Sequence, residues 1–107
     1  MNSFDDREKA FENKFAHDAE MQFKAEARRN KLLGLWAADK MGMTGDAADA
    51  YAKEVVASDF EEAGDEDVYR KVSGDLGAKA TGVSEAEIRE QMKSLMVEAK
   101  AQLFSET

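Results

Sequence analysis

The stretch LLGLWAADKM, residues 32–41, is apolar on most sides of a helix, as a segment buried in a protein core should be. Gly34 lies inside it and disfavours a helix by about 1 kcal/mol relative to alanine, so we expect a bend or a close helix contact there. The chain contains no proline, and no strong helix breaker precedes Gly42. Ser3 and Asp6 resemble a capping box, so the pattern predicts one long first helix that begins near Ser3.

Three further helices are expected downstream, roughly over residues 46–62, 66–77 and 85–105, because apolar residues recur there at helical spacing. Thr44 or Asp46 is suited to cap the first of these helices and Asp65 the second. Four helices with short connections predict an all-α protein with a four-helix bundle. Its expected core consists of Leu32, Leu33, Leu35, Trp36, Tyr51, Val55, Val68, Val72, Ile88, Met92, Leu95 and Leu103.

The N-terminal segment has a different pattern, because four of the six phenylalanines fall within the first 23 residues and each is surrounded by charge. Their narrow stripe ends where Glu26, Arg29 and Asn30 would continue it, and the bundle core can be filled without it. A helix of about 20 residues is marginal alone in water, so this arm should be mobile when free. We therefore predict an N-terminal arm over residues 1–19 and a bundle domain over 20–107, with Phe23 at their junction.

Two interpretations of the arm remain open from this pattern. It either packs along the bundle, or it enters a groove of another protein through its spaced apolar anchors. Burial of four phenylalanines would give a gross gain of roughly 6–12 kcal/mol before the cost of ordering the arm. A segment that orders on binding suits a regulator.

The net charge of −8 is unevenly distributed, since residues 24–31 carry +3 and residues 44–67 carry −8. An acidic chain with one short basic patch is a poor candidate for nucleic-acid binding and better suited to a partner with basic surface. The patch itself, Arg28, Arg29 and Lys31, could contact a nucleotide weakly. It could equally pair with Glu26 or with the acidic second helix.

Catalytic chemistry has little support in the sequence. His17 is the only histidine and there is no cysteine, so we find neither a nucleophilic triad nor a thiolate metal site. His17 is either a solvated surface group or a pH-sensing one. The acidic turn beginning at Asp65 lacks the glycine and glutamate of a calcium loop, and no glycine-rich phosphate loop occurs. We expect no enzyme activity, no metal and no cofactor.

Location is constrained by two further absences from the sequence. No uninterrupted apolar run is long enough to cross a bilayer, and the acidic N-terminus is unlike a signal peptide. We therefore expect a soluble intracellular protein without direct membrane insertion.

Three long strings of the chain carry a family resemblance. They are FDDREKAFENKFAHDAEMQFKAEARRNKLLGLWAA at 4–38, TGDAADAYA at 44–52 and SDFEEAGDEDVYRKV at 58–72. Together they resemble the zeta subunit family, the ATPase inhibitors of alphaproteobacterial F-type ATP synthases, over roughly residues 3–76. The last helix resembles the family mainly in pattern.

The resemblance implies a four-helix inhibitor of ATP hydrolysis that is monomeric when free. It implies that the N-terminal helix inserts at a catalytic alpha/beta subunit interface near the gamma rotor, hindering hydrolysis while leaving synthesis largely available. The protein would then be cytoplasmic, peripheral to the inner membrane through the ATP synthase. The partner-binding residues carried over are Phe4, Asp5, Asp6, Arg7, Phe11, Lys14 and Phe15. The alternative is a small helical regulatory domain that binds an adenine nucleotide or an unrelated protein.

Overall fold

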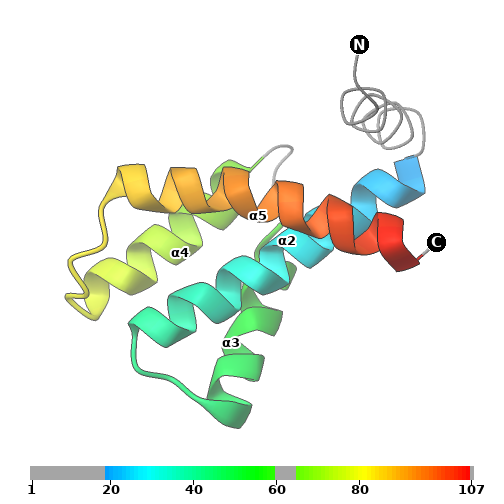
Figure 1. Cartoon of the computed structure of the whole chain (residues 1–107). Coiled ribbons are helices and arrows are strands. Elements are labelled where there is room, and N and C mark those ends of the chain that lie inside the picture. Colours follow the sequence, from blue (N-terminus) through cyan, green and yellow to red (C-terminus); the bar gives the residue numbers. More distant parts are fainter. Residues whose placement is uncertain (1–18, 60–64, 107) are drawn as a thin grey trace.

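The computed structural model describes residues 19–59 and 65–106, and these residues form four helices without a strand among them. The helices are α2 (Ala19–Lys40), α3 (Gly45–Ser58), α4 (Glu66–Ala78) and α5 (Glu85–Glu106), labelled as in Figure 1. The predicted all-α class is confirmed. The part of the first helix expected before Ala19, and the expected end of the second helix at 60–62, lie outside the described residues.

The helices differ in whether a side chain caps their N-terminal end. The Ser84 hydroxyl accepts a hydrogen bond from the Glu87 backbone N–H at 3.1 Å, so Ser84 caps the start of α5. Thr44 and Asp65 occupy the N-cap positions of α3 and α4, but neither side chain caps its helix. The Asp65 carboxylate instead binds Arg29 of α2. One predicted cap residue therefore serves a contact between helices.

Helix α2 is the common packing surface of the described fold, because α3, α4 and α5 all contact it. In Figure 1, α5 crosses over α2 on one side while α3 lies on the other, and α4 runs beneath the first half of α5. The main buried cluster comprises Leu33, Ala37, Ala38, Tyr51, Val55, Val68, Val72, Leu76, Ile88, Met92 and Leu95. Most of the expected core is thus buried, whereas Leu32, Leu35 and Trp36 are half-buried.

The crossing of α2 and α3 is unusually close at Gly34. A Cβ atom placed on Gly34 would lie 2.6 Å from the Ala52 Cα atom, nearer than van der Waals contact permits. The absence of a side chain therefore allows the two backbones to meet. The close helix contact expected at this glycine is confirmed.

The N-terminal half of α2 packs differently from its C-terminal half. Met21 and Ala25 form a second, smaller buried cluster with Leu103 of α5, and Met96 packs against it. Phe23, expected at the junction of arm and bundle, has a side chain that is 56% exposed. None of the described helices combines the length and apolarity that crossing a membrane would need.

Candidate functional site

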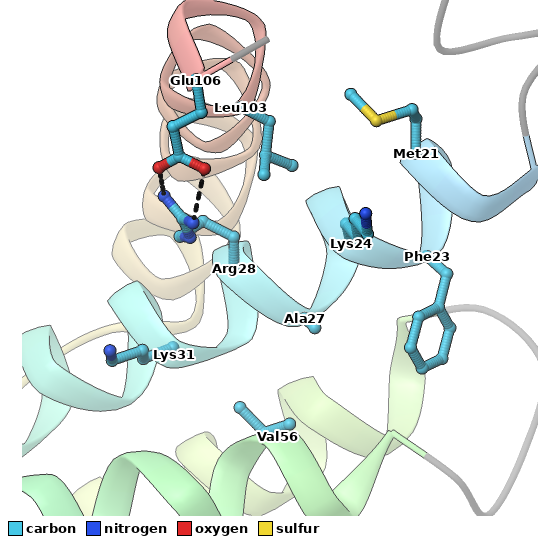
Figure 2. A pocket seen from close by; sticks show the side chains of 9 residues that line it. All are labelled: Met21, Phe23, Lys24, Ala27, Arg28, Lys31, Val56, Leu103 and Glu106. Atoms are coloured by element: carbon cyan, nitrogen blue, oxygen red, sulfur yellow. Dashed lines mark hydrogen bonds and ion pairs between the residues drawn. The ribbon is translucent and has the colours of Figure 1, made fainter.

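A hollow of about 610 Å³ lies over the N-terminal half of α2, flanked by the C-terminal ends of α3 and α5 (Figure 2). Its size is typical of ligand sites, although it is open rather than enclosed. We call it the α2 groove. It is lined by Met21, Phe23, Lys24, Ala27, Arg28, Lys31, Val56, Leu103 and Glu106.

Arg28 lines the groove, and its positive charge is already paired with a carboxylate of the same protein. Its guanidinium donates to both carboxylate oxygens of Glu106, at 2.9 and 3.2 Å, and to the Gln102 side-chain oxygen at 2.8 Å. The hydrogen bonds from Arg28 lower the pKa of the Glu106 carboxyl below its usual value. This bidentate ion pair links the end of α5 to α2, as Figure 2 shows.

Arg29 points away from the groove into the protein. Its side chain is 2% exposed, and its Nη2 donates to Asp65 Oδ1 at 2.8 Å while Nε donates to Asn30 Oδ1 at 2.6 Å. Lys31 is exposed and forms no ion pair with another described residue. The three basic residues singled out by the sequence therefore face different surroundings, and only Arg28 and Lys31 line the groove.

The buried contact of Arg29 belongs to a polar cluster that sequence reasoning missed. Asn30 is fully buried, and Asp67 of α4 is 7% exposed with one carboxylate oxygen bound to Arg70. Among the described residues, Asn30 Nδ2 and Asp67 Oδ2 have no partner within normal hydrogen-bond distance. A signal was present in the sequence, because Arg29 continues the step-of-four series of Ala25, Leu33 and Ala37, all fully buried.

Asp59, which follows α3, lies close to this cluster. Its burial raises the pKa of its carboxyl, and the neighbouring Asn30 amide and Arg29 guanidinium offset part of that rise. Carboxylates at this junction do not form a metal site, since no group of three ligands of the right kind occurs among residues 19–59 and 65–106. The cluster therefore serves to join α2 to the end of α3 and the start of α4.

The seven residues expected to contact a partner, Phe4, Asp5, Asp6, Arg7, Phe11, Lys14 and Phe15, all lie outside the described residues, as does His17. The described part of the chain begins at Ala19, in α2. The α2 groove starts two residues further on, at Met21. The N-terminal segment and the groove are thus adjacent along the chain.

Comparison with known proteins matches this chain to a family model and to solved structures. A family model described as ATPase inhibitor subunit zeta matches residues 1–102. A chain solved by solution NMR is 62% identical to this one, with 81% of this chain and 99% of that chain covered and a TM-score of 0.73. The search of curated proteins found no match. The family match includes the N-terminal segment and the residues of α2 and α3 that line the groove, whereas Leu103 and Glu106 of α5 lie beyond it.

Proposed function

This chain belongs to the ATPase inhibitor subunit zeta family, and we propose that it inhibits ATP hydrolysis by the catalytic sector of an F-type ATP synthase. The observation that carries the proposal is the extent of the family match, which spans residues 1–102 and so includes the arm as well as the bundle. The protein would act as a non-catalytic regulator, held at the membrane periphery through the ATP synthase.

We assign the inhibitory contact to residues 1–19, as a wedge at a catalytic alpha/beta interface near gamma. The family match supports this assignment, because it includes the segment from residue 1 on. Phe4, Phe11 and Phe15 would be the apolar anchors, each contributing about 1.5–3 kcal/mol on burial. Arg7 and Lys14 would orient the segment, and Asp5 and Asp6 favour a helix start through the helix dipole.

Hydrolysis of ATP by a purified F-type catalytic sector tests this proposal. Full-length protein should inhibit, whereas protein lacking residues 1–19 should not, because the anchors are removed. Replacement of Phe4, Phe11 and Phe15 together by alanine should raise the half-inhibitory concentration at least about 100-fold. Val97→Ala is the matched control, because Val97 is an exposed apolar residue of α5 and its loss should leave inhibition unchanged.

Circular dichroism should show that the truncated protein keeps the helices of the bundle, so that loss of inhibition reports loss of the arm. Equal inhibition by the full-length and truncated proteins would contradict the assignment to residues 1–19. Absence of inhibition by the full-length protein would contradict the proposed function itself.

An adenine-nucleotide site near Arg28, Arg29 and Lys31 is the second candidate function. Arg28 and Lys31 do line the α2 groove beside the exposed ring of Phe23, which supports it. However, Arg29 is buried against Asp65, and Arg28 is neutralised by Glu106. Titration with ATP or ADP, followed by backbone amide shifts over residues 23–31, distinguishes this function from protein binding.

A further inference from the structure

The α2 groove continues along the seam between α2 and α3. A second hollow of about 430 Å³ is lined by Lys31, Asp49, Ala52, Lys53 and Val56, so it shares Lys31 and Val56 with the first. The two hollows therefore form one elongated groove that starts at Phe23 and follows both helices. An elongated open groove suits an extended partner better than a compact small molecule.

Two of the lysines that line this groove, Lys24 and Lys31, are spaced along α2. Lys24, Ala27 and Lys31 follow i, i+3 and i+7 spacing, which places all three on one face of α2. The rise of a helix puts Lys24 and Lys31 roughly 10 Å apart along its axis. Lys24 pairs at 3.2 Å with Glu20, but both side chains are largely exposed, so this pair is easily exchanged for another.

An apolar surface accompanies these cations. The Phe23 ring is one of the few large apolar side chains left exposed among the described residues. Figure 2 shows Phe23 and Val56 extending from α2 and α3 into the space between the helices, with the small Ala27 side chain between the two lysines. A partner backbone can approach closely at an alanine, while Phe23 and Val56 offer a site for one apolar side chain.

We infer that this groove binds an acidic amphipathic helix of the ATPase, as a second contact beside the N-terminal arm. Carboxylates two turns apart on that helix would meet Lys24 and Lys31, and an apolar residue between them would sit against Phe23 and Val56. This inference rests on the proposed function. The charge of the lining supports it: on a chain of net charge −8, four cations, Lys24, Arg28, Lys31 and Lys53, line the groove against two acids, Asp49 and Glu106.

A nucleotide fits this arrangement less well than a helix does. The phosphates of ATP are adjacent to one another, whereas Lys24 and Lys31 are two helical turns apart and the Arg28 guanidinium between them is bound to Glu106. Carboxylates at i and i+7 of a partner helix match that spacing directly. The groove is therefore assigned to a protein helix, and nucleotide binding becomes a result that the test can return.

The test compares two double variants of the full-length protein in the hydrolysis assay with a purified F-type catalytic sector. Lys24→Glu with Lys31→Glu reverses the charge of the two α2 lysines that line the groove. Lys79→Glu with Lys93→Glu is the matched control, since it changes the net charge equally at exposed positions outside the groove. The groove variant should raise the half-inhibitory concentration about tenfold relative to the control variant, because attraction is replaced by repulsion at two positions.

Two further measurements, the salt dependence of inhibition and the effect of Phe23→Ala, separate the charged from the apolar contribution to binding. The difference between the two double variants should shrink towards 1 M salt, where the screening length falls to about 3 Å. Phe23→Ala should raise the half-inhibitory concentration about fivefold, and this effect should persist in high salt because it is apolar. Circular dichroism should show unchanged helix content for all variants, since the replaced side chains are exposed.

The outcomes separate the two proposals. Inhibition by the wild-type protein, together with equal half-inhibitory concentrations for the two double variants, would overturn the groove assignment and leave the proposed function intact. No inhibition by the wild-type protein would overturn both. Saturable amide shifts over residues 23–31 on addition of ATP, lost in the groove variant, would assign the groove to a nucleotide and overturn the helix.

Discussion

The substitution Gly34→Ala tests whether the close crossing of α2 and α3 determines the stability of the bundle. A Cβ atom at position 34 would lie 2.6 Å from Ala52 Cα, 3.2 Å from Ala52 Cβ and 3.2 Å from a Val55 methyl carbon. The closest of these atoms belongs to the backbone, so a rotamer change cannot relieve the contact. The two helices must move apart by roughly 1 Å to reach ordinary packing distance.

Two opposing terms set the magnitude. Alanine is favoured over glycine inside a helix by about 1 kcal/mol, which would stabilise α2. Overpacking of a tight core costs about 1–3 kcal/mol. We expect the upper end here, because the clash is with backbone and because separation of the helices also loosens Val55, which is fully buried. The net result should be a loss of about 2 kcal/mol in the free energy of unfolding.

Urea unfolding, followed by circular dichroism and by the fluorescence of Trp36 in α2, measures this loss. The melting temperature should fall by roughly 8 °C or more for a domain of this size. Gly74→Ala is the matched control, because Gly74 lies inside α4 and a Cβ atom there would meet nothing within 4 Å. That variant should be more stable than the wild type by about 1 kcal/mol. A Gly34→Ala protein as stable as the wild type would refute the reasoning.

Three further predictions concern the ionised groups. Arg29→Met should lower the free energy of unfolding by about 1–3 kcal/mol because the buried Asn30 and the exposed Asp65 lose their donor, and an unchanged free energy in chemical denaturation would contradict this. Burial raises the pKa of Asp59 in the folded state, so its ionisation costs stability as pH rises from about 4, near the unfolded value. Asp59→Asn should therefore stabilise the protein slightly at pH 7, a gain that thermal melting should show disappearing below about pH 4. Arg28 lowers the pKa of Glu106, so the carboxyl titration of Glu106, read by NMR, should have its midpoint below about 4.3 and return to that value in Arg28→Ala.

The sequence predicts best those helices whose starts and buried faces are determined by residues close together in the chain. The last two helices were expected over 66–77 and 85–105, and α4 and α5 are found over Glu66–Ala78 and Glu85–Glu106. Their starts depend on residues next to them in the chain, such as the Ser84 cap, and their buried faces follow from apolar spacing alone. No knowledge of the other helices is needed for either inference.

The polar cluster at Arg29 could not be predicted in the same way. Apolar spacing treats arginine as exposed, and Arg29 reverses that expectation because Asp65, 36 positions later, lies where the guanidinium can reach it. The position of Asp65 was expected, at the start of α4, but its role as the partner of Arg29 depends on how α2 and α4 cross. Contacts that depend on helix crossing are not visible in local sequence.

The candidate site, too, could be predicted only where its residues lie together in the sequence. Spacing on one helix was enough to identify the basic residues of 24–31, but the groove also needs Val56 from α3 and Leu103 and Glu106 from α5. The exposure of Phe23 likewise depends on which surfaces α3 and α5 leave uncovered. The seven arm residues, in contrast, stay predictions, because they lie outside the described residues.

The two halves of α2 contribute different numbers of buried apolar residues to the described core. This difference bears on how the arm and the groove are linked. Its C-terminal half contributes Leu33, Ala37 and Ala38 to the main cluster, whereas its N-terminal half contributes only Met21 and Ala25 to the smaller one. Segments with fewer buried apolar contacts open more easily. The N-terminal half continues from the proposed inhibitory segment and carries Lys24 of the groove, and Lys31 follows just beyond it. A partner helix bound there would order the part of α2 that leads into the arm, so each contact should strengthen the other.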